Sequence, residues 1–65
     1  MDTATKSESH PGARRAAAAH LRQAAWETET AAFLCAREAP AREVGDLIAL
    51  SVRIRDIADT LDRVM

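Results

Sequence analysis

The most constraining feature of this sequence is an apolar pattern near its C-terminal end. Large apolar residues recur there at alternating steps of three and four, the spacing of one face of an α-helix. They are Leu47, Leu50, Ile54, Ile57, Leu61 and Val64. This seam predicts an amphipathic helix that packs against a neighbouring helix. It covers too few heptads for a parallel coiled coil, so packing in a helical bundle is favoured.

A second helical segment precedes the seam. Residues 13–38 are mostly strong helix formers, and the helical pattern resumes at residue 41 and continues to residue 64. Pro40 separates the two segments, because proline disfavours helical geometry in the residue before it and suits the first turn of a new helix. We predict an all-α fold, a two-helix antiparallel hairpin. A single long helix kinked at Pro40 is the competing geometry.

The chain before these helices is polar. Residues 1–12 have almost no large apolar side chains and cannot offset the entropy of ordering, so we expect a disordered N-terminal tail.

The two predicted helices present different apolar surfaces. The first carries small residues on the side expected to be buried, namely Ala17, Ala18, Leu21, Ala24, Ala25, Thr28, Ala32 and Cys35. This small-residue side complements the large seam residues of the second helix. Further apolar residues lie elsewhere: Trp26 and Phe33 share another face of the first helix, and Val44, Ile48 and Val52 form a second stripe. An isolated hairpin would leave these residues exposed.

A chain of 65 residues rarely builds a sufficient core alone. The single cysteine, Cys35, cannot form an intrachain disulfide, and with His10 and His20 it offers no zinc-ligand spacing. We therefore expect no metal or cofactor, and predict a homodimer that forms a four-helix bundle. The seam residues, with Trp26 and Phe33, are the predicted interface to the second copy or to a protein partner.

The sequence contains no constellation of residues typical of an enzyme. It has no glycine-rich phosphate loop, paired-histidine motif or Ser/His/Asp set, and its carboxylates are explained as solvated charges. Cys35 is predicted to act as a small apolar side chain, and His20 to lie at the surface. The net charge of -1 gives no global basic field of the kind typical of nucleic-acid binding.

Localisation is predicted from what the sequence lacks. No signal-peptide pattern or apolar run of membrane-spanning length occurs, so we expect a cytoplasmic protein without a membrane partner. The high alanine and arginine content suggests a bacterial source. The leading functional prediction is a non-enzymatic helical protein that acts by self-association and by binding a protein partner, as a regulator, adaptor or assembly subunit.

The segment "LRQAAWETETAAFLCAREAPAREVGDLIALSVRIRDI" resembles small bacterial helix-turn-helix regulators, above all in "AREVGDLIALSVR". The resemblance implies that Gly45 lies where two helices cross and that Ser51 caps a recognition helix. It also implies that Arg53 and Arg55 point at DNA. The turn position that this family fills with glycine is Ala49 here. From the resemblance as a whole, the alternative prediction is a dimeric helix-turn-helix DNA-binding transcriptional regulator.

Overall fold

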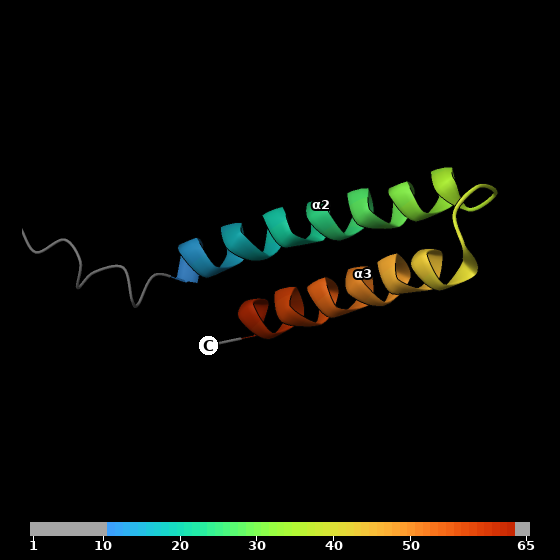
Figure 1. The fold of residues 1–65 in the computed structure, drawn as a ribbon. Coiled ribbons are helices and arrows are strands. Elements are labelled where there is room, and N and C mark those ends of the chain that lie inside the picture. Colours follow the sequence, from blue (N-terminus) through green and yellow to red (C-terminus); the bar gives the residue numbers. More distant parts are fainter. Residues whose placement is uncertain (1–10, 64–65) are drawn as a thin grey trace, which may run out of the picture.

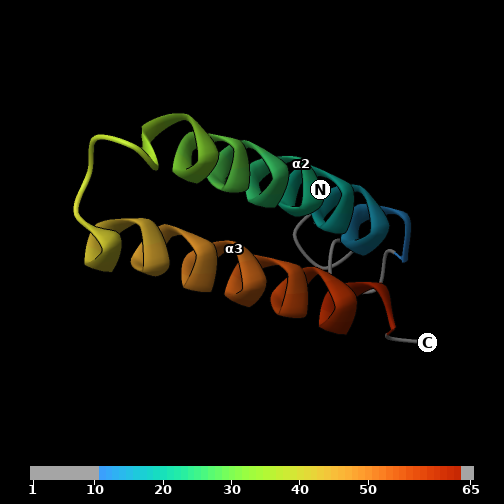
Figure 2. The same ribbon diagram turned by 90° about the vertical axis from the view of Figure 1, so that its right-hand side faces the viewer.

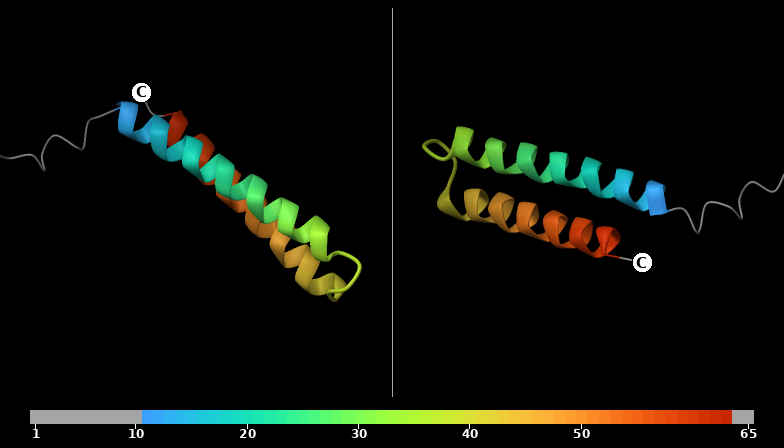
Figure 3. Two further views of the ribbon diagram at one scale, coloured as in Figure 1. Left: turned by 90° about the horizontal axis from the view of Figure 1, so that it is seen from above. Right: turned by 180° about the vertical axis from the view of Figure 1, so that it is seen from behind.

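The computed structural model describes residues 11–63, which form two α-helices and contain no strand. Helix α2 spans Pro11–Cys35 and helix α3 spans Ala41–Asp62. The helices lie side by side and antiparallel, joined by a short turn at one end of the molecule (Figure 1). The same arrangement is visible when the molecule is turned (Figures 2 and 3). The predicted all-α hairpin is confirmed.

The chain reverses its direction between the two helices, so it does not form the single long helix kinked at Pro40. Helix α2 ends at Cys35, whose carbonyl accepts hydrogen bonds from the backbone N–H groups of Glu38 at 3.0 Å and Ala39 at 2.8 Å. Pro40 is extended, with φ -59° and ψ 145°, and its carbonyl accepts from the N–H of Val44 at 3.2 Å in the first turn of α3. Pro40 therefore lies at the N-cap of α3, where its fixed φ suits the start of a helix.

The helix bounds differ from the pattern at both ends of α2. Pro11 and Gly12 belong to its first turn, whereas the sequence pattern placed them in the tail. At the other end, α2 stops three residues before residue 38, because the chain must reverse before Pro40. The rest of the predicted tail, residues 1–10, and Val64 lie outside the described residues.

Small side chains form the contact between the helices. The fully buried residues of α2 are Ala18, Ala25 and Ala32, and those of α3 are Ser51 and Ala58. Each set recurs every seven residues, so each marks the line along which one helix faces the other. Such small residues allow the helix axes to approach closely.

The contact line on α3 differs from the hairpin interface that the seam predicted. Leu47, Ile54 and Leu61 are partly buried beside it, but Leu50 and Ile57 are about half exposed, at 48% and 49%. The prediction that the seam as a whole packs on the first helix was wrong for these two residues. The reason is that Ser51 and Ala58, each one position further along, occupy the centre of the contact.

On α2, the predicted burial of the small-residue side is likewise wrong for two residues. Leu21, Thr28 and Cys35 are partly buried as expected, but Ala17 and Ala24 are exposed. Each lies one position before a fully buried alanine and is therefore rotated out of the contact.

Candidate functional site

The contact line divides the surface of the hairpin into two sides. Along a helix, the residue before a buried position lies about 100° to one side of it, and the residue after lies about 100° to the other. The residues before the buried positions are all exposed and form what we call the alanine face: Ala17, Ala24, Ala31, Leu50 and Ile57. It combines small side chains on α2 with large ones on α3.

The opposite side carries the aromatic residues. Trp26 and Phe33 follow the buried Ala25 and Ala32, and Val52 follows the buried Ser51. With Ile48, four residues before Val52, they form what we call the aromatic face. Trp26 is 63% exposed, Phe33 67% and Val52 48%. The predicted interface residues are thus distributed over both faces, with Trp26 and Phe33 on one and Leu50 and Ile57 on the other.

Ion pairs between the helices lie on the same side as the aromatic residues. Arg55 Nη2 of α3 donates to Glu29 Oε1 of α2 at 2.6 Å. Glu29 is three residues after Trp26 and four before Phe33, so it lies between them along the helix. The pair therefore joins α2 to α3 in the middle of the aromatic face.

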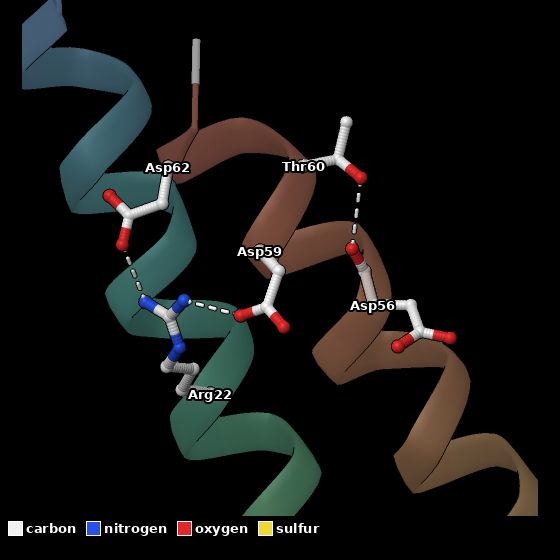
Figure 4. Close-up of polar contacts among 5 residues, drawn as sticks. All are labelled: Arg22, Asp56, Asp59, Thr60 and Asp62. Atoms are coloured by element: carbon white, nitrogen blue, oxygen red, sulfur yellow. Dashed lines mark hydrogen bonds and ion pairs between the residues drawn. The ribbon is translucent and has the colours of Figure 1, made fainter.

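Arg22 makes a second link closer to the helix ends. Its two terminal nitrogens donate to Asp59 Oδ1 at 2.7 Å and to Asp62 Oδ2 at 2.9 Å, so one guanidinium holds two carboxylates of α3 (Figure 4). The hydrogen bond that Arg22 donates to Asp59, and then the one that it donates to Asp62, raises the pKa of Arg22 above its ordinary value. Arg22 is therefore charged at every pH at which the protein would be studied.

A shallow, open groove surrounds this cluster. It is lined by Arg15, Arg22, Asp59, Asp62 and Arg63. The two carboxylates are engaged by Arg22, so the groove is a site of charge pairing between helices. Within residues 11–63, no group of three or more His, Cys, Asp or Glu side chains could hold a metal ion.

The residues implicated by the helix-turn-helix resemblance have other surroundings. Helix α3 is continuous through Ala49, where the resemblance places a turn. Ser51 is buried inside this helix, and its hydroxyl donates to the carbonyl of Ile48 at 2.8 Å. Arg55 is paired with Glu29, while Arg53 is exposed.

Two further side chains considered as candidate functional residues, Cys35 and His20, lie far apart along α2. Cys35 is partly buried, and its Sγ lies 3.7 Å from the carbonyl oxygen of Ala32. His20 is exposed on α2.

Two features were not predicted from the sequence. The first is the cross-helix cluster of Arg22, because the carboxylates were expected to be solvated charges and not partners of an arginine on the other helix. The second is Leu34, which is 81% exposed. The pairing of Arg22 with Asp59 and Asp62 follows only once the antiparallel register of the two helices is known.

In comparisons with protein-family models, curated proteins and solved structures, nothing matches this chain. Neither helix of the described segment has the length and apolar character needed to cross a membrane.

Proposed function

We propose that this protein is a small non-enzymatic helical hairpin that acts by self-association and by binding a protein partner, as a regulator, adaptor or assembly subunit. One observation carries the proposal. In the part of the chain that the structure describes, the largest fully buried side chain is a serine, while Trp26, Phe33, Leu50 and Ile57 remain about half exposed or more.

The single hairpin buries little of its large apolar side chains. Each buried alanine methyl contributes about 0.8 kcal/mol, whereas a fully buried Leu, Ile or Phe side chain contributes roughly 1.5–3 kcal/mol. In the hairpin the larger contributions are mostly unrealised, and small domains have little stability to spare. Association with another apolar surface would supply the burial that the single chain lacks.

The solution mass of the purified chain, measured by light scattering, tests the proposal. A folded hairpin that self-associates has a mass of at least twice 7.1 kDa. A folded, stable species of 7.1 kDa would contradict it.

The same measurement with a random DNA duplex tests the alternative, in which Ser51, Arg53 and Arg55 contact DNA. The proposal expects no change in mass when the duplex is added. A rise in mass at low salt that disappears at moderate salt, and that Arg53→Ala removes, would favour the DNA-binding regulator instead.

A further inference from the structure

We propose that the alanine face is the surface on which a second copy of the chain docks, with α3 of each copy lying antiparallel on α2 of the other. This inference rests on the proposed self-association and adds the face and the register. Its basis is that the face is complementary to itself. Leu50 and Ile57 on α3 are seven residues apart, as are the exposed Ala24 and Ala31 on α2.

The ion pair between Glu29 and Arg55 sets the register, because its 2.6 Å distance places these residues at about the same level along the hairpin. The helices are antiparallel, so moving back along α3 corresponds to moving forward along α2. Leu50, five residues before Arg55, is level with a point about five residues after Glu29, near residue 34. Ile57, two residues after Arg55, is level with a point near residue 27.

Symmetry then places these residues on the second copy. A two-fold axis parallel to the helices keeps every residue at its own level and lays α2 of the second copy over α3. Leu50 then enters between Ala31 and Cys35 of that copy, since residue 34 lies between them. Ile57 likewise enters between Ala24 and Thr28. Both large side chains insert between smaller ones, the arrangement of a well-packed helical bundle.

Charge at the edge of the face favours the same arrangement. Glu27 follows Ala24 by three residues, and Arg53 follows Leu50 by three, so the two exposed charges lie along opposite edges of the alanine face, Glu27 on the outer side of α2 and Arg53 on the outer side of α3. With α3 on α2, Arg53 of each copy lies about one helical turn from Glu27 of the other, within reach of its side chain. With α2 on α2 and α3 on α3, the glutamate-bearing edges meet each other, as do the arginine-bearing edges.

Three matched aspartate variants of the full chain test the face. Leu50, Ile57 and Val52 are almost equally exposed, at 48%, 49% and 48%, but Val52 lies on the aromatic face. Leu50→Asp and Ile57→Asp should each weaken the dimer at least roughly a hundredfold, because each would bury an unpaired charge. Val52→Asp should leave the dissociation constant within about threefold of wild type, because solvent covers that position.

A charge exchange between Glu27 and Arg53 tests the register of the two copies. Both positions are exposed, so these substitutions should leave the hairpin folded. Glu27→Arg should weaken the dimer several-fold by placing two arginines together, and adding Arg53→Glu should restore it. Analytical ultracentrifugation over a range of concentrations measures both series.

The outcomes separate this inference from the proposed function. A wild-type monomer overturns both. A wild-type dimer that Val52→Asp also dissociates, or that Leu50→Asp and Ile57→Asp leave intact, overturns the choice of face while self-association stands. A double variant no tighter than Glu27→Arg alone overturns the packing of α3 on α2.

Discussion

Arg55 of α3 donates a hydrogen bond to Glu29 of α2 across 2.6 Å, and this contact ties the two helices together in the middle of the aromatic face. Both side chains keep some exposure, 42% for Arg55 and 28% for Glu29, so solvent screens the pair. We expect a coupling free energy of about 0.2–1 kcal/mol between Glu29→Ala and Arg55→Ala in a double-mutant cycle of urea unfolding. The coupling should shrink as salt is added. Strict additivity of the two changes would show that the contact contributes nothing to the fold.

Ser51 provides a test of the close approach of the helices. Its hydroxyl donates to a carbonyl of its own helix, so Ser51→Ala removes no hydrogen bond between the helices and introduces a better helix former. The free energy of unfolding should stay within about 0.5 kcal/mol of wild type. Ser51→Leu should instead lower it by about 1–3 kcal/mol, because the contact line has no room for a large side chain. Equal stabilities for the two variants would place Ser51 outside the helix contact.

Gly45 separates the observed continuous helix from the helix-turn-helix resemblance. It is exposed in α3, and a Cβ built on it meets nothing within 4 Å. Gly45→Ala should therefore raise the free energy of unfolding by up to about 1 kcal/mol, through better helix propensity. Gly12 is equally open but lies in the first turn of α2, where helices fray, so Gly12→Ala is the control and should have a smaller effect. Destabilisation by Gly45→Ala would show that another segment approaches this glycine, as the resemblance implies.

The sequence was sufficient to predict the hairpin because two local signals agreed. Segments with a helical pattern flank Pro40, and proline both disfavours the helix before it and suits the start of a new one. Periodicity was a poorer guide to orientation. The seam through Leu50 and Ile57 identifies the most apolar side of the helix, but the contact is centred on Ser51 and Ala58, rotated away from it.

This rotation has a physical reason. Residue size decides which positions allow two helices to approach, and apolar character alone does not. A sequence pattern that weighs large apolar residues most heavily gives little weight to a serine or an alanine at the contact line. The cross-helix pairing of Arg22 with Asp59 was missed for a related reason, since it depends on a register that only the folded hairpin defines.

If the hairpin derives its stability from association, as we propose, its thermal unfolding depends on protein concentration. Circular dichroism would follow helix loss in samples that span about a hundredfold range of protein concentration. Because unfolding of an obligate assembly releases separate chains, the midpoint temperature should rise with concentration. A cooperative transition whose midpoint stays constant across that range would show instead that one chain folds alone and does not need association for its stability.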